Sequence, residues 1–182
     1  MKITNIPRAI KYFFSLFKEV NRLEKHYLAK RWLVCKAECD KAIAAGLGGF
    51  FAHYYLGLTN SELGHVDEST RNLKYALDNF SDRGIKAFRN FAKYKIAMNY
   101  IQQEQYDLAF EQIDRNMSED PKYLNNYELK ASIYLGLDDM DKAIETVLQA
   151  LQKAPKNERL KKYRDYLSYS YSVALSDKRN GG

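Results

Sequence analysis

Two cysteines lie four residues apart, at Cys35 and Cys39, and this spacing places both thiols on one face of a predicted helix. Two such thiolates could belong to a zinc site, which would need two further ligands. They could also pack as small apolar side chains, as free cysteines often do. A helical setting argues against a disulfide between them. We therefore expect both cysteines to lie in the core.

The other residues that could do chemistry form no recognisable site. The histidines His26, His53 and His65 are scattered, and none has the His-x-x-x-His spacing of a helical metal site. Asp138 and Asp139 are expected in a loop, without the buried pocket that perturbs a catalytic carboxylate. The sequence thus predicts no catalytic residue, no metal site and no cofactor, and an enzyme is the last function that we consider.

A glycine-rich stretch at residues 46–49 could suggest a phosphate-binding loop. No strand is predicted before it, whereas a phosphate-binding loop joins a strand to a helix. A turn that ends a helix explains these glycines better.

The net charge of +6 is unevenly distributed along the 182 residues. Residues 1–41 and 156–182 are basic, whereas residues 42–155 carry more acidic than basic side chains. Such a polarised chain does not favour nucleic-acid binding. The low cysteine count favours a reducing compartment, so we expect a cytoplasmic location.

The chain repeats itself with a period of 34 residues, which four pairs of identical residues reveal. The pairs are Ala97 and Ala131, Tyr100 and Tyr134, Ala109 and Ala143, and Pro121 and Pro155. Small residues, an aromatic residue and a closing proline at these offsets resemble the tetratricopeptide repeat (TPR), a pair of antiparallel helices. Neighbouring pairs must stack, because one pair cannot bury its apolar face alone.

The resemblance implies an all-α fold, a right-handed superhelix (α-solenoid) of helix pairs in a single domain spanning residues 1–182. Residues 84–89, between the second and third repeats, should extend the following helix, because their apolar residues keep helical spacing. The predicted parts are an N-terminal amphipathic helix at 1–15, repeats at 16–49, 50–83, 90–123 and 124–157, a capping helix at 158–175 and a disordered tail at 176–182.

Each repeat is numbered here from 1 to 34, and two of its positions carry a structural expectation. An acidic residue at position 18 should cap the second helix and suit its positive end; these residues are Asp67, Asp107 and Asp141. A large aliphatic residue at position 24 should fill the core between helices; these residues are Leu73, Ile113 and Val147.

The resemblance also implies a binding surface. In TPR proteins the first helix of each pair lines a concave groove, which positions 2, 5, 9, 12 and 13 face. Apolar anchors in such a groove bind bulky side chains of a partner. The candidate groove residues are Phe17, Val20, Tyr27, Phe51, Tyr54, Leu58, Phe91, Tyr94, Met98, Ile101 and Glu128.

The family also includes domains that clamp the carboxylate of a chaperone C-terminus with basic and amide side chains. The matching positions hold Val20, Glu24, Tyr55, Phe91 and Lys95, of which Lys95 alone has the required charge. The sequence therefore argues against a carboxylate clamp.

Three functions remain open, with oligomeric state undetermined. The first is a non-catalytic adaptor or chaperone-like scaffold that holds a protein or peptide segment in the groove. The second is a scaffold at a membrane surface, anchored by the basic amphipathic stretch at residues 6–20. For this stretch we favour capping of the first repeat or occupation of the groove over membrane anchoring, because the end of a solenoid must be covered. The third is a scaffold that assembles with copies of itself.

Overall fold

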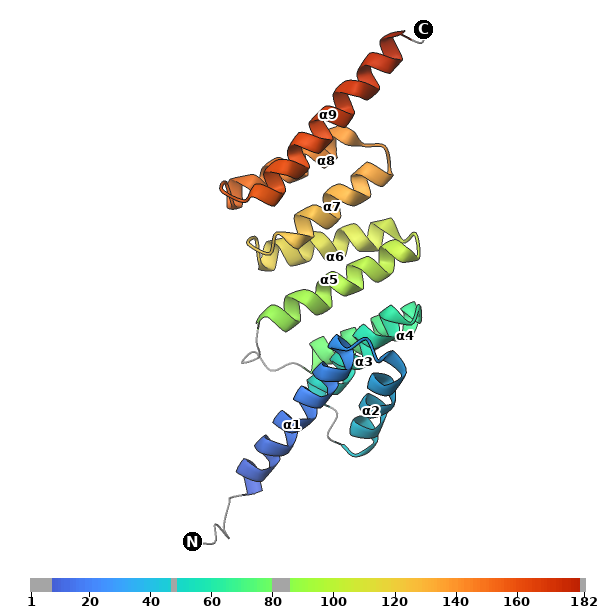
Figure 1. The fold of residues 1–182 in the computed structure, drawn as a ribbon, viewed down its shortest axis with the longest axis vertical. Coiled ribbons are helices and arrows are strands. Elements are labelled where there is room, and N and C mark those ends of the chain that lie inside the picture. Colours follow the sequence, from blue (N-terminus) through green and yellow to red (C-terminus); the bar gives the residue numbers. More distant parts are fainter. Residues whose placement is uncertain (1–7, 47–48, 80–85, 181–182) are drawn as a thin grey trace. The chain divides into compact units, whose positions relative to one another are not determined.

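The structure is a computed structural model that describes residues 8–46, 49–79 and 86–180 (Figure 1). Every regular element in these ranges is an α-helix, which confirms the all-α prediction. The helices are α1 (Arg8–Leu28), α2 (Trp32–Ala44), α3 (Gly49–Glu62), α4 (Val66–Asp78), α5 (Lys86–Gln102), α6 (Tyr106–Glu119), α7 (Asn125–Gly136), α8 (Met140–Lys153) and α9 (Glu158–Asn180).

Contacts divide the chain into two compact units, Met1–Asn99 and Tyr100–Gly182. In the first unit α1 packs on α2 and α3, and α3 packs on α2 and α4. In the second, α7 packs on α6 and α8, and α8 on α9. Because α5 runs across the boundary, this division does not test the predicted single domain, which stays a prediction.

The core follows the repeat. The three aliphatic residues at position 24, Leu73, Ile113 and Val147, have no exposed surface, as predicted. Position 8 holds a small buried residue in each of the last three repeats, which lets the two helices of a pair approach closely. These residues are Gly57, Ala97 and Ala131.

The turn inside each pair has the same form four times. The residue at position 15 adopts a left-handed conformation, with φ between 55° and 78°. The next residue donates its backbone N–H to the carbonyl five residues earlier, at 2.8–3.0 Å, which satisfies a free carbonyl at the helix end. The position-15 residues are Lys30, Gly64, Glu104 and Asp138.

The predicted caps at position 18 are wrong. Asp67, Asp107 and Asp141 lie inside the first turn of α4, α6 and α8. The residue that precedes each helix is at position 16, and there only Asp139 uses its side chain, accepting from the Lys142 N–H at 3.1 Å. The position-18 carboxylates still lie near the positive ends of their helices, where a negative charge is favourable.

The ends of the chain differ from two further predictions. The tail is helical as far as residue 180, because α9 continues to Asn180 and the chain has neither glycine nor proline between 159 and 180 to stop it. The boundary predicted at residue 15 falls inside α1, which is continuous from Arg8 to Leu28. Of the predicted helical extension at 84–89, residues 86–89 belong to α5, and residues 84–85 lie outside the described residues.

Gly57 gives a direct test of the close helix approach. A Cβ atom at this position would lie 2.7 Å from Leu73 Cγ and 3.1 Å from the Leu73 backbone nitrogen. We expect Gly57→Ala to lower the free energy of unfolding by about 1–3 kcal/mol, because the core must shift to admit the methyl group. Gly136→Ala is the control: a Cβ atom there meets nothing within 4 Å, so this variant should be neutral or more stable. Urea unfolding of both variants measures the difference, and equal stability would contradict the close approach.

The left-handed turns give a second test. Glu104→Gly should raise the free energy of unfolding by about 1 kcal/mol, because glycine adopts a positive φ without steric cost. Gly64→Ala should lower it by a similar amount, since nothing but the backbone conformation opposes the methyl group there. Glu111→Gly, inside α6, is the control and should destabilise the protein. Thermal unfolding measures these changes. If Glu104→Gly and Glu111→Gly shifted the melting temperature in the same direction, the left-handed conformation of residue 104 would be contradicted.

Candidate binding surface

Four aromatic rings from α3 and α5 form one cluster in the first unit. Phe88 lies edge-on to Phe51 and Tyr54, with ring centroids 5.3 and 5.2 Å apart. Phe50 stacks on Tyr54 at 5.3 Å. Edge-to-face contacts of this kind add about 0.5–1.5 kcal/mol each beyond the area that they bury. The cluster therefore fixes the start of α5 against α3.

This cluster changes the role of two candidate groove residues. Tyr54 is 4% exposed and Leu58 is 1% exposed, so both belong to the core. The prediction that both line the groove gives them accessible surface that they do not have in the free chain; for Tyr54 the reason is Phe88, from the segment between the second and third repeats, which packs on its ring. Phe51 remains half-buried.

A line of polar contacts joins the first helices of three successive pairs. The Tyr27 hydroxyl on α1 donates to the Glu62 carboxylate on α3 at 3.4 Å. Lys95 Nζ on α5 donates to the same oxygen at 2.9 Å. Burial, and then the charge of Glu62, raises the pKa of Tyr27 to about 12, so its hydroxyl keeps its proton at neutral pH. Tyr27 and Glu62, at groove positions 12 and 13, thus connect α1 to α3, and Lys95 connects α5 to the same carboxylate.

The same contacts bear on the carboxylate clamp. Lys95 is the one residue with the right charge at the clamp positions, and its side chain is only 12% exposed. Its ammonium group is paired with Glu62 at 2.9 Å. A ligand carboxylate would have to displace Glu62, which agrees with the argument against a clamp.

A buried amide holds the next junction. Asn99 on α5 is 1% exposed and donates to Ser69 at 2.8 Å and to Thr70 at 3.0 Å, both on α4. Its side-chain oxygen accepts from Ser61 on α3 at 3.2 Å. Removing the amide would leave these hydroxyls with fewer partners in a buried position, which costs about 1–3 kcal/mol.

Three candidate residues on α5 keep accessible surface. Phe91 and Tyr94 stack on each other, with ring centroids 6.2 Å apart, and both are half-buried. Met98, one turn further along the helix, is 37% exposed. These residues occupy positions 2, 5 and 9 of the third repeat, and we call them the α5 strip. All three are candidate groove residues, and each keeps part of its surface exposed.

The remaining candidates are not joined to the strip by a described contact. Val20, Tyr27 and Ile101 are half-buried. Glu128 on α7 pairs with Arg159 of α9 at 3.0 Å, and its pKa is nevertheless raised because burial outweighs the nearby cation. Phe17 lies outside the residues whose side chains are described.

Three of the residues that could do chemistry pack in the structure. Cys35 and Cys39 are free thiols without exposed surface, as predicted for the core. His53 packs on the Tyr75 ring with centroids 4.1 Å apart. Among the residues that the structure describes, no three or more His, Cys, Asp or Glu side chains gather closely enough to hold a metal ion. No helix in the described ranges is both long and apolar enough to cross a membrane.

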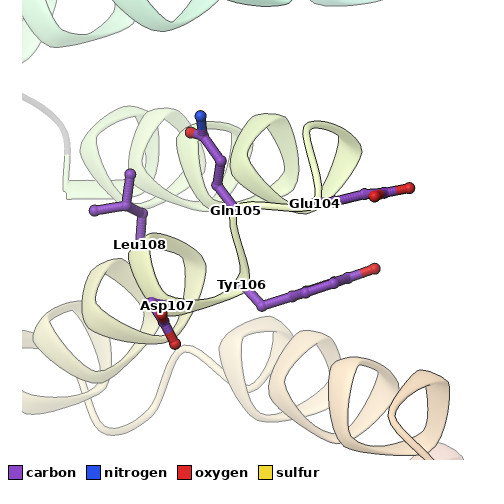
Figure 2. Close-up of a pocket in the computed structure, with 5 residues that line it drawn as sticks. All are labelled: Glu104, Gln105, Tyr106, Asp107 and Leu108. Carbon is purple, nitrogen blue, oxygen red and sulfur yellow. The ribbon is translucent and has the colours of Figure 1, made fainter.

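A depression of about 390 Å³ lies at the turn between α5 and α6 (Figure 2). Its lining comes from one continuous segment, with Glu104 in the left-handed conformation. Glu104 and Tyr106 extend in the same direction, whereas Leu108 points elsewhere (Figure 2). A depression built from one exposed turn lacks the convergent polar groups of a small-molecule site.

Comparison with known proteins identifies the fold. No protein-family model matches the chain, and no curated protein matches it in sequence. Among solved structures, YrrB, described as a TPR protein with an unusual peptide-binding site, matches with a TM-score of 0.63 at 17% identity, over 79% of this chain and 71% of YrrB. The fold is that of a TPR protein. The resemblance seen in the sequence is thereby confirmed at the level of the fold.

Two further TPR structures agree. MamA (residue 41 to the end) from Desulfovibrio magneticus RS-1 matches with a TM-score of 0.64 at 14% identity, over 91% of this chain and 96% of that one. A chain of the APC/C hetero-tetramer Cut9–Hcn1 matches with a TM-score of 0.68 at 13% identity, over 82% of this chain and 29% of that one. Identities this low establish a common TPR fold and nothing finer.

The burial of Tyr54 leads to a stability test. Tyr54→Ala should lower the free energy of unfolding by about 3–5 kcal/mol, the range for a buried aromatic residue replaced by alanine. Met98→Ala, on the exposed part of the α5 strip, should cost less than about 1 kcal/mol. Chemical unfolding of the two variants gives the comparison. Similar losses would show that the cluster around Phe88 does not hold Tyr54 in the core.

Proposed function

We propose that this TPR protein is a non-catalytic scaffold that binds a protein or peptide segment along the first helices of its pairs. The observation that carries the proposal is the α5 strip, Phe91, Tyr94 and Met98. Partly exposed aromatic and methionine side chains with helical spacing suit the bulky apolar side chains of a partner.

The contacts within the first unit support α5 rather than α3 as the contact helix. On α3, Tyr54 and Leu58 are buried and Glu62 is paired with Lys95. A partner would have to break these contacts to reach them, at a cost to its binding free energy. On the α5 strip, by contrast, Met98 is exposed and can be reached directly.

The paired state of Lys95 also bears on the type of partner. With this ammonium group engaged by Glu62 at 2.9 Å, the first unit offers apolar surface rather than a carboxylate site. The partner segment that fits best is therefore anchored by one or two aromatic or large aliphatic side chains. A terminal carboxylate would contribute little.

The similar structures support the same class of function. YrrB is described as having a peptide-binding site, and Cut9 and Hcn1 form a hetero-tetramer. The proposal includes a cytoplasmic location, which the two free thiols support. Membrane attachment through residues 6–20 stays a separate prediction, because residues 1–7 and the side chains of residues 8–17 lie outside the described part of the chain.

Peptide selection tests the proposal. Peptides selected from a phage-displayed library on the full chain should be rich in aromatic or aliphatic residues. Tyr94→Ala and Met98→Ala should each weaken the binding of a selected peptide by about 1–3 kcal/mol, because they remove groove anchors. Isothermal titration calorimetry with the synthetic peptide measures this loss.

Leu148→Ala is the matched control. Leu148 is 43% exposed on α8, the second helix of its pair, so its loss should leave peptide affinity unchanged. Equal affinity of the Tyr94, Met98 and Leu148 variants would exclude the α5 strip as the contact surface. A selection that yields no binding peptide would count against peptide binding itself.

A further inference from the structure

The turn between α1 and α2 exposes a group of apolar side chains. Leu28 at the end of α1 is 70% exposed. Leu33 and Val34 in the first turn of α2 are 74% and 46% exposed. Side chains exposed to this extent project from the surface and do not line a depression. We call these three residues the turn patch.

The other repeats of the chain show that this patch is unusual. Leu33 occupies position 18, where the next three repeats all have aspartate, at Asp67, Asp107 and Asp141. Leu28 occupies position 13, where those repeats have Glu62, Gln102 and Gly136. Packing in the core does not explain why leucine stands at these two positions, since both leucines are more than two-thirds exposed. Exposed apolar groups at otherwise polar positions indicate a contact surface.

Basic side chains lie next to the turn patch in the sequence. Lys25, Lys30 and Arg31 are all exposed, and none of them pairs with a carboxylate among the described residues. The sequence contains no acidic residue between Glu24 and Glu38. The patch therefore combines projecting aliphatic groups with unneutralised positive charge.

We propose that the turn patch docks on an anionic lipid bilayer. Leu28, Leu33 and Val34 would enter the interfacial region, and the surrounding cations would meet lipid phosphate and carboxylate groups. Burial of aliphatic side chains at the acyl boundary makes the free energy of membrane binding more favourable, and each nearby cation adds electrostatic attraction to an anionic surface. This membrane contact lies on α1 and α2 and is separate from the α5 strip.

A second copy of the chain and another protein partner fit the turn patch less well than a bilayer does. A two-fold contact with a second copy would place the same cations opposite one another, and their repulsion opposes such an interface. Three side chains also fall short of the ~800 Å² per partner that a stable protein interface buries. A planar surface of negative charge satisfies projecting side chains and their basic rim together.

Vesicle sedimentation with the full chain tests the proposal. The chain should bind vesicles of phosphatidylcholine with 30% phosphatidylserine, the probe composition we choose because its net charge is negative. Binding to pure phosphatidylcholine should be weaker, and added salt should reduce binding to the anionic vesicles because it screens the cations. The double variant Leu28→Ser with Leu33→Ser should bind anionic vesicles about tenfold or more weakly, since two inserting groups are lost.

A charge variant with suitable backbone preferences complements this test. Lys30→Asn with Arg31→Asn should weaken binding roughly fivefold per charge removed. Asparagine tolerates the positive φ of residue 30 and is favoured at the N-cap position of residue 31, so the turn should remain folded. The matched controls, Leu148→Ser and Lys122→Asn with Lys156→Asn, change exposed residues of the second unit and should bind as the wild type does.

Three results would overturn the proposal. One is no binding to anionic vesicles at low salt. Another is binding that the leucine and cation variants leave unchanged, which would place the membrane contact elsewhere. The last is a wild-type dimer in sedimentation velocity that the double leucine variant converts to monomer without a change in vesicle binding. Tyr94→Ala should bind vesicles normally, so failure of the membrane contact and failure of peptide binding can be distinguished.

Discussion

The close approach of the two helices of a pair, seen at Gly57 between α3 and α4, is the constraint on which the rest of the structure depends. Gly57 lies against Leu73 with no room for a methyl group, and Ala97 and Ala131 hold the same repeat position without exposed surface. The left-handed residue at position 15 returns the chain so that this approach is possible. With both features fixed, each pair presents one apolar side to the next, and stacking follows because burial of that side requires a neighbour.

The repeat made the helix pairs and their core predictable, because position 24 acts within one pair and recurs as Leu73, Ile113 and Val147. The left-handed turn at position 15 was not predictable in this way, because its four residues differ. The capping prediction is wrong because the second helix begins at position 17, which places the acidic residue at position 18 inside its first turn. The burial of Tyr54 was missed for a different reason. It depends on Phe88, which lies outside the repeat and contacts α3 only once the chain is folded. Periodicity carries no information about a residue that does not repeat.

The junction between the second and third repeats shows how a repeat fold acquires individual contacts. Position 10 is aliphatic at Ile133, but Asn99 places a buried amide there and joins three helices through hydroxyl groups. A buried amide requires its particular partners, whereas an aliphatic side chain accepts many neighbours. Together with the pairing of Glu62 and Lys95, this network specifies which helices pack together. The same contacts occupy polar groups that a ligand would otherwise meet on α3, whereas Met98 of the α5 strip stays exposed.

The last helix shows the same separation between packing and contact. Leu160 and Leu167 of α9 hold positions 3 and 10 and have no exposed surface. By contrast, α9 carries Asp165 at position 8, where the four earlier first helices hold an apolar or small residue, so a second helix is not expected to approach α9 closely there; the earlier residues are Leu23, Gly57, Ala97 and Ala131. Its aromatic residues Tyr166 and Tyr169, at groove positions 9 and 12, are 60% and 71% exposed. A helix that only ended the stack would gain nothing from exposed tyrosines at those positions, because water solvates polar groups at lower cost. Under the proposed function, exposed tyrosines at groove positions would be available to a partner, which a helix serving only to cover the stack would not need.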